Sequence, residues 1–103
     1  MSLYSLTRQA RQDIIEIWTY IAEDNPEAAD RVEQAIFDAC EFVAASPGRG
    51  HINARLTDRA LRFWTLPKFS NYIVVYDPES SPVTVIAVVH GKRNLARALR
   101  RRQ

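Results

Sequence analysis

The residue best suited to acid–base chemistry is His90, which ends an apolar run directly before Gly91. An imidazole titrates near neutral pH, so His90 could transfer a proton during a reaction. Arg62, which alternates out of an earlier apolar segment, could lie across a sheet from it. A histidine in this place could equally cap the strand end and hydrogen-bond across the sheet, and Arg62 and Lys68 could be ordinary surface charges. Both interpretations stay open.

The segment after His90 is strongly basic. Six cations and no acid occupy residues 92–102, namely Lys92, Arg93, Arg97, Arg100, Arg101 and Arg102. Leu95, Ala98 and Leu99 recur at helical spacing, so this segment could be a docked terminal helix whose cations complement the helix dipole. A cap does not need so many cations. We therefore expect the segment to bind an acidic partner, either protein or nucleic acid.

The other reactive side chains have simpler interpretations. Cys40 lies within an apolar helical stripe and is expected to be a small core residue. His51 stands alone in a loop, and two histidines with one cysteine lack the spacing of a metal site. Glu16, Glu23 and Asp24 are expected to form a solvated helix face. The three glycines form no phosphate-binding loop, so no cofactor or metal is predicted.

Length and composition predict one small globular domain over residues 1–103. Hydrophobic residues make up 47% and charged residues 25% of the chain, which are globular values. No apolar run reaches the ~20 residues that span a membrane, and the N-terminus does not resemble a secretory signal. With a single cysteine as well, we expect a soluble cytoplasmic protein.

Charge is divided unevenly along the chain. Residues 1–45 hold nine acids and three basic residues, a net of −6, and residues 46–103 hold three acids and eleven basic residues, a net of +8. Together these recover the overall net charge of +2. The division predicts either that one half faces an anionic partner or that the two halves offer different surfaces to different partners.

Two amphipathic helices are predicted in the acidic half. Thr7 suits the N-cap of a helix over residues 7–23, and Asn25 followed by Pro26 suits the start of a second helix. The second helix should extend to the break at "SPGRG". Because the link is so short, the helices must form an antiparallel hairpin. Its expected core residues are Ile14, Trp18, Ile21, Val32 and Ile36.

The hydrophobic period changes in the second half, where "ALRFWTLP", "NYIVVYD" and "PVTVIAVVH" predict three strands. The last two are apolar on both faces and should be central to the sheet. "LYSLT" predicts a short strand before the first helix. The expected fold is α+β in the order β-α-α-β-β-β, with the helical hairpin packed on a mainly antiparallel sheet in two layers. A short basic helix or tail should end the chain.

These segments, in this order, resemble the ParE/RelE toxin superfamily of bacterial toxin–antitoxin systems, and its ParE branch in particular. The resemblance covers nearly the whole chain and rests on "TRQARQDIIEIWTYIAE", "ASPGRG", "LRFWTLPKFSNYIVVY" and "VVHGKRNL". It implies a toxin that a cognate ParD-like antitoxin neutralises in a hetero-oligomer, wrapping it with a C-terminal helix and an extended segment.

The two branches imply different targets. ParE-like members inhibit DNA gyrase without known catalytic residues, so the target contacts here would be His90, Lys92, Arg93, Arg97, Arg100 and Arg101. RelE-like members cut messenger RNA on the ribosome, and the catalytic set would then be His90, Arg62, Lys92 and Arg93 as acid/base and phosphate clamps. A late tyrosine is common in RelE-like members, but Tyr76 is the last one here. Gyrase inhibition is therefore the favoured function, with the ribosome-dependent nuclease as the alternative.

Overall fold

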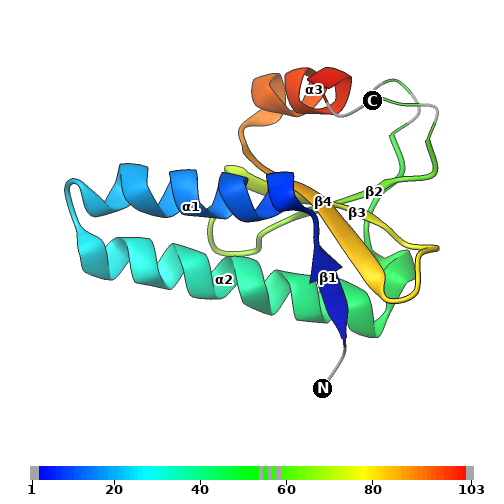
Figure 1. Ribbon diagram of the computed structural model, residues 1–103, viewed down its shortest axis with the longest axis horizontal. Helices are drawn as coiled ribbons and strands as arrows, with labels where there is room; N and C mark the ends of the chain where they lie inside the picture. The colour runs from blue at the N-terminus through cyan, green and yellow to red at the C-terminus, as the bar shows by residue number, and fades with distance from the viewer. Residues whose placement is uncertain (1–2, 54, 56, 58, 102–103) are drawn as a thin grey trace.

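The computed structural model describes residues 3–53, 55, 57 and 59–101, apart from the side chains of residues 92, 93, 100 and 101. Its elements follow one another as β1 (Tyr4–Leu6), α1 (Arg8–Ala22), α2 (Pro26–Ala45), a 3-10 turn η1 (Pro47–Arg49), β2 (Arg62–Thr65), β3 (Tyr72–Asp77), β4 (Val83–His90) and α3 (Lys92–Arg101) (Figure 1). This confirms the expected order, and the basic C-terminal segment forms a helix. Within the described part, no helix is both long enough and apolar enough to cross a membrane.

The hairpin begins each of its helices with a side-chain cap. The Thr7 hydroxyl accepts a hydrogen bond from the backbone N–H of Ala10 at 3.0 Å, and the Asn25 side-chain oxygen accepts one from the N–H of Ala28 at 3.1 Å. Each bond satisfies an N–H that the first helical turn leaves free. Both caps were predicted from the sequence, and the bounds of α1 differ from the prediction by one residue at each end.

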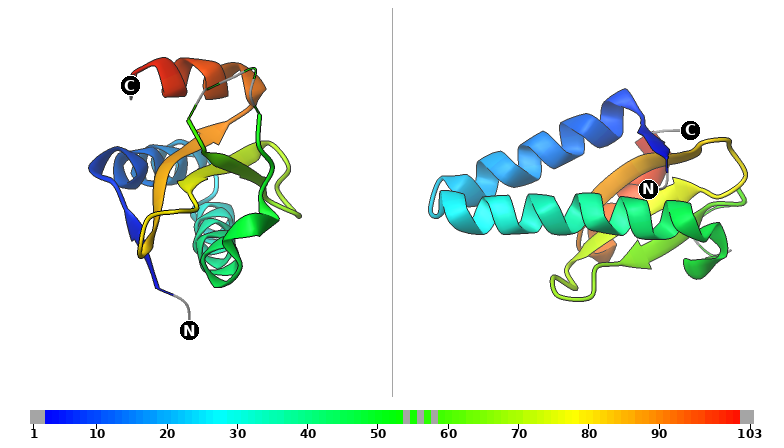
Figure 2. Two further views of the ribbon diagram at one scale, coloured as in Figure 1. Left: turned by 90° about the vertical axis from the view of Figure 1, so that its right-hand side faces the viewer. Right: turned by 90° about the horizontal axis from the view of Figure 1, so that it is seen from below.

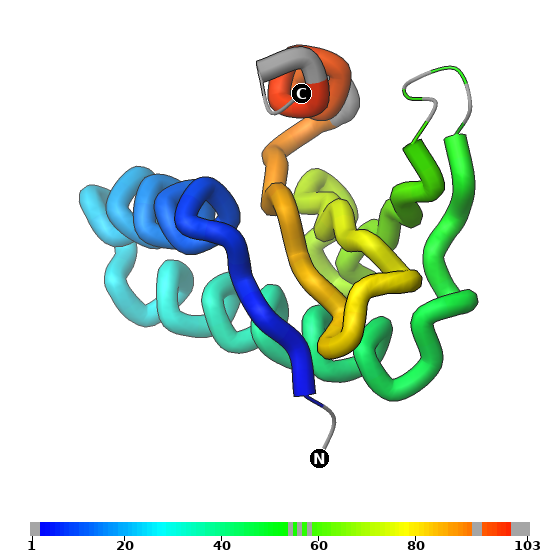
Figure 3. Tube along the Cα trace, turned by 45° about the vertical axis from the view of Figure 1, so that its right-hand side comes forward, coloured from blue at the N-terminus to red at the C-terminus, as the bar shows by residue number. Residues whose placement is uncertain are grey.

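The four strands form one sheet in the order β1-β4-β3-β2. The β2–β3 and β3–β4 pairs are antiparallel and the β1–β4 pair is parallel, so the sheet is mainly antiparallel with β3 and β4 in its centre, as predicted. β1 pairs only with Val83–Val85 before the chain turns into α1 (Figure 3). The second half of β4 therefore has α1, rather than a strand, along that edge.

Helices cover both faces of the sheet, which corrects the expectation of two layers. The hairpin packs on one face, where Val74, Tyr76 and Val85 meet α1 and α2. On the other face, α3 packs through Leu95, Ala98 and Leu99 against the remaining apolar side chains, which are Leu61, Phe63, Ile73, Val75, Ile86, Ala87 and Val89. Figure 2 shows the sheet between α3 and the hairpin. The last two strands are apolar on both faces because both faces are covered.

A bulge in β4 helps to fill the α3 face. Val75 pairs with Ala87 and Tyr76 with Val85, which leaves Ile86 as an extra residue. An extra residue breaks the strict alternation of a strand. Ile86 and Ala87 consequently both join the cluster under α3.

The expected hairpin core needs one correction. Ile14, Val32 and Ile36 are buried, and Ile21 is partly buried against them. Trp18 instead lies half-buried at the rim, where its indole N–H donates to the Asp30 carboxylate at 2.8 Å. An indole buried fully would need an internal acceptor for this N–H. The exposed Asp30 provides one at the surface instead.

Candidate functional site

The end of β4 presents His90 to solvent between the hairpin and α3. His90 pairs with Tyr72 of β3, and the two ring centroids lie 4.8 Å apart at an interplanar angle of 51°. Its backbone carbonyl accepts a hydrogen bond from the Asn94 side-chain amide at 2.6 Å. Gly91 follows with a φ of 83°, a conformation that glycine adopts without strain. This turn starts α3 across the opposite face of the sheet.

Arg62 lies at the other end of the sheet and does not meet His90. It pairs with Tyr76, whereas His90 pairs with Tyr72, so their partners on β3 are four residue steps apart, or about 13 Å along the strand. The Arg62 guanidinium donates to the carbonyls of Gly50 at 2.7 Å and Gly48 at 3.3 Å. The possibility that Arg62 faces His90 across the sheet is thus corrected, and Arg62 instead fastens the turn after α2.

Tyr76 of β3 also binds the turn after α2. Its hydroxyl accepts from the N–H of Gly50 at 2.8 Å and donates to the carbonyl of Pro47 at 2.7 Å. A Cβ at position 50 would lie 2.6 Å from that hydroxyl oxygen, so the close approach requires glycine. Burial raises the pKa of Tyr76, while its bond with Gly50 and the nearby Arg62 act in the opposite direction. The phenol therefore stays a hydrogen-bond donor.

The basic residues of α3 are described to different extents. Arg97 has an exposed side chain, and the helix that carries it is held on the sheet by Leu95 and Leu99, with 5% and 1% of their surface exposed. Target contacts were also predicted at Lys92, Arg93, Arg100 and Arg101, but these side chains are not among those that the structure describes. Arg97 thus projects from a helix that is docked on the sheet through buried apolar side chains.

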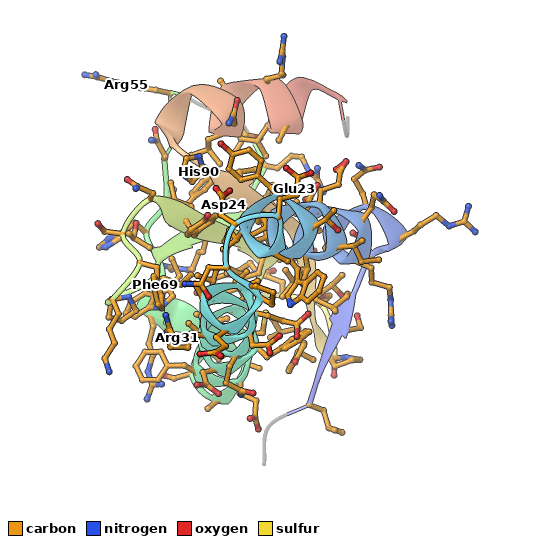
Figure 4. All side chains as sticks on the ribbon, turned by 90° about the vertical axis from the view of Figure 1, so that its left-hand side faces the viewer. Glu23, Asp24, Arg31, Arg55, Phe69 and His90 are labelled. Carbon is orange, nitrogen blue, oxygen red and sulfur yellow. The ribbon has the colours of Figure 1, made fainter. Side chains whose placement is uncertain are left out.

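A hollow of about 260 Å³ lies between α1 and α3 over the end of β4. Its lining comes from three elements: Gln9, Asp13, Glu16 and Ile17 of α1, Val88, Val89 and His90 of β4, and Asn94, Arg97 and Ala98 of α3. Figure 4 shows His90 between the ribbons of α1 and α3. Because acids stand on one wall and Arg97 on the other, the hollow offers charges of both signs.

Asp13 joins α1 to the strand in this hollow. Its carboxylate accepts a hydrogen bond from the backbone N–H of Val88 at 3.0 Å. That N–H lies on the part of β4 that β1 does not pair with. Sequence reasoning missed this contact. The available signal was an acid beside the apolar stripe of α1, one residue before Ile14.

A second hollow, of about 310 Å³, lies between α2 and β2 and is walled by Phe42, Trp64 and Leu66. The rings of Phe42 and Trp64 lie 5.1 Å apart, and the Arg49 guanidinium sits 3.7 Å from the centre of the Phe42 ring. Arg49 also donates to the carbonyl of Phe42 at 2.8 Å. These contacts close the C-terminal end of α2, so they have a structural role in the turn.

Known proteins resemble this chain in both sequence and fold. Residues 4–95 match the model of a family described as the ParE toxin of the type II toxin–antitoxin system parDE. The chain belongs to the ParE toxin family. A solved structure titled "Chromosomal ParDE TA system from P. aeruginosa" has the same fold, with a TM-score of 0.69 and 19% identity over 89% of this chain and 98% of that chain. No curated protein matches the chain.

The ParE family match reaches His90 and the start of α3 but ends at Leu95. Arg97, Arg100 and Arg101 therefore lie beyond the matched segment. The apolar side chains that dock this later part, Ala98 and Leu99, are buried all the same. The part of α3 beyond the family match is therefore docked on the sheet as well.

Three simpler expectations hold in this ParE-family chain. Cys40 is fully buried, and burial raises the pKa of its thiol to about 12, so it is a core residue. His51 is exposed, and its backbone forms an isolated bridge with Phe63 through two hydrogen bonds of 2.8 Å. Glu16, Glu23 and Asp24 are exposed on the hairpin.

Proposed function

We propose that this ParE-family toxin inhibits DNA gyrase through protein contact in the bacterial cytoplasm. The observation that carries this proposal is the docking of α3. Its apolar residues Leu95, Ala98 and Leu99 are buried on the sheet, while Arg97 of the same helix is exposed. A cationic helix docked in this way presents Arg97 from a backbone that is already folded, so binding to an acidic patch on a partner would not have to order the helix itself.

Contact is a better account than catalysis because the nuclease set is divided. A nuclease needs a proton-transfer group together with cations that stabilise the developing phosphate charge. Here the Arg62 guanidinium bonds to the turn carbonyls of Gly48 and Gly50, at the far end of β3 from the partner of His90. Cleavage of messenger RNA on the ribosome is kept as the outcome that would refute the proposal.

Neutralisation by a cognate ParD-like antitoxin completes the proposed function. Residues 46–103 carry a net charge of +8, so an acidic antitoxin segment would be steered to that half of the chain. Binding across α3 or the adjoining hollow would block access of gyrase to Arg97. The toxin and antitoxin would then form an inactive hetero-oligomer.

Charge reversal at Arg97 tests the inhibitor proposal. Arg97→Glu should restore growth of cells that express the toxin, and gyrase should keep its supercoiling activity in the presence of the purified variant. The matched control is Arg31→Glu on α2, an exposed site of the same type in the other half of the chain. Deleting residues 97–103 is less informative, since it also removes the buried Ala98 and Leu99.

Two readouts separate the inhibitor from the nuclease. Gyrase supercoiling should fail with the unmodified chain while transcripts on translating ribosomes stay intact. His90→Ala should leave most of the toxicity in place. Cleaved transcripts with normal supercoiling, accompanied by a 10²–10⁴-fold loss of cleavage rate in His90→Ala, would refute gyrase inhibition.

A further inference from the structure

A small notch lies beside His90 on the hairpin side of β4. It has a volume of about 270 Å³ and is lined by Glu16, Ile17 and Tyr20 of α1 together with Tyr72 and His90 from the sheet. Small-molecule sites usually span roughly 300–1,000 Å³. A notch just below that range suits one side chain of a partner.

Three aromatic rings form the walls of the notch. The Tyr72 and His90 rings are tilted by 51° with their centroids 4.8 Å apart, and Tyr20 projects from α1 with 77% of its surface exposed. Burial, and then the nearby Tyr20 hydroxyl, raise the pKa of Tyr72, which is consistent with the two phenols lying close together. Aromatic faces carry negative charge density and attract cations placed over them.

The charge around the notch is negative, which also favours a cation. Glu16 lines it directly, and Asp13 lines the adjoining hollow. Glu23 and Asp24 lie further along the hairpin, toward the viewer in Figure 4. Arg97, the described cation of this region, lines the adjoining hollow and not the notch. A cation entering here would meet π faces and a carboxylate.

We propose that this notch binds a cationic side chain, an arginine above all, presented by a partner protein. A guanidinium is flat, so it can stack on a tyrosine ring while its N–H groups bond to the Glu16 carboxylate. The inference goes beyond the proposed function and does not depend on gyrase being the target. It assigns the hairpin side of His90 to a basic group, whereas α3 on the other side is assigned to an acidic one.

The test uses Nα-acetyl-arginine methylamide as the probe, titrated into the full-length chain and followed by NMR. The ring signals of Tyr20, Tyr72 and His90 should shift in a saturable manner. The citrulline analogue, which has nearly the same shape but no charge, should bind markedly more weakly. No saturable shift, or equal shifts with both probes, would overturn the proposal.

Matched variants locate the binding. Tyr20→Ala should weaken arginine binding roughly 2- to 30-fold, the range expected for a cation–π contact, and Tyr20→Phe should keep most of it. Glu16→Gln should also weaken it, whereas Glu23→Gln, with the same loss of charge on the exposed end of the hairpin, should not. An unchanged affinity in Tyr20→Ala, with the amide spectrum showing an intact fold, would equally overturn the proposal.

Discussion

The carboxylate of Asp13 on α1 accepts a hydrogen bond from the backbone N–H of Val88 on β4, 75 residues away in the chain, at 3.0 Å. β1 pairs with Val83–Val85 and then leaves the sheet. At Val88 a side chain of α1 therefore satisfies a donor that a neighbouring strand would otherwise satisfy. The contact fixes α1 on the strand that ends at His90.

Removing this carboxylate should destabilise the fold. Asp13→Ala is expected to lower the free energy of unfolding by about 1–3 kcal/mol, because the N–H of the buried Val88 loses its acceptor. Urea denaturation would measure the change. Glu16→Ala, an exposed carboxylate three residues along α1, is the control and should change stability by less than about 0.5 kcal/mol. Equal effects would mean that the Asp13 bond contributes nothing.

The Tyr76 hydroxyl should stabilise the turn after α2. Tyr76→Phe keeps the ring but removes the bonds to Gly50 and Pro47, so a loss of about 1–3 kcal/mol is expected. Tyr20→Phe removes an exposed hydroxyl and should cost less than about 0.5 kcal/mol. Thermal or urea unfolding of both variants gives the comparison. A neutral Tyr76→Phe would show that water replaces the hydroxyl in the turn.

Cys40 should make stability depend on alkaline pH. Burial raises the pKa of its thiol to about 12, above the ordinary value of about 8.5 that it regains on unfolding. Between these two values the unfolded chain binds fewer protons than the folded chain. The free energy of unfolding should therefore fall as pH rises, by up to about 1.4 kcal/mol per pH unit.

The control for this effect is Cys40→Ala, which has no thiol to ionise. Its stability should fall less steeply than that of the unmodified chain between pH 9 and 11, when both are measured by urea unfolding. Tyrosines also titrate there, so the difference between the two chains is the relevant quantity. Parallel pH profiles would show that the Cys40 thiol has the same pKa in the folded and the unfolded chain.

The hairpin core should depend more on Ile36 than on Trp18. Ile36 is fully buried, and Ile36→Ala should cost about 2–5 kcal/mol through lost burial and the cavity left behind. Trp18 lies half-buried at the rim, so Trp18→Ala should cost less than Ile36→Ala in spite of its larger side chain. Denaturation midpoints of the two variants would decide the order. The reverse order would place the Trp18 ring in the core.

Local features of this chain could be predicted because neighbouring residues determine them. Thr7, Asn25 and Pro26 mark the helix starts through caps that reach only three residues along the chain. The short link forces the hairpin, and apolar residues on both faces of "NYIVVYD" and "PVTVIAVVH" indicate central strands. Spacing in "NLARALRRR" also indicated a helix with an apolar side.

Only the tertiary structure decided which distant residues meet. The position of Arg62 depends on the register of β2 on β3, and that of His90 on the register of β3 on β4 with its bulge at Ile86. A bulge of one residue has no clear signature in an apolar strand, yet it changes which side chains face α3. The notch of Glu16, Tyr20, Tyr72 and His90 likewise joins a helix to strands more than 50 residues away, through packing that no local pattern encodes.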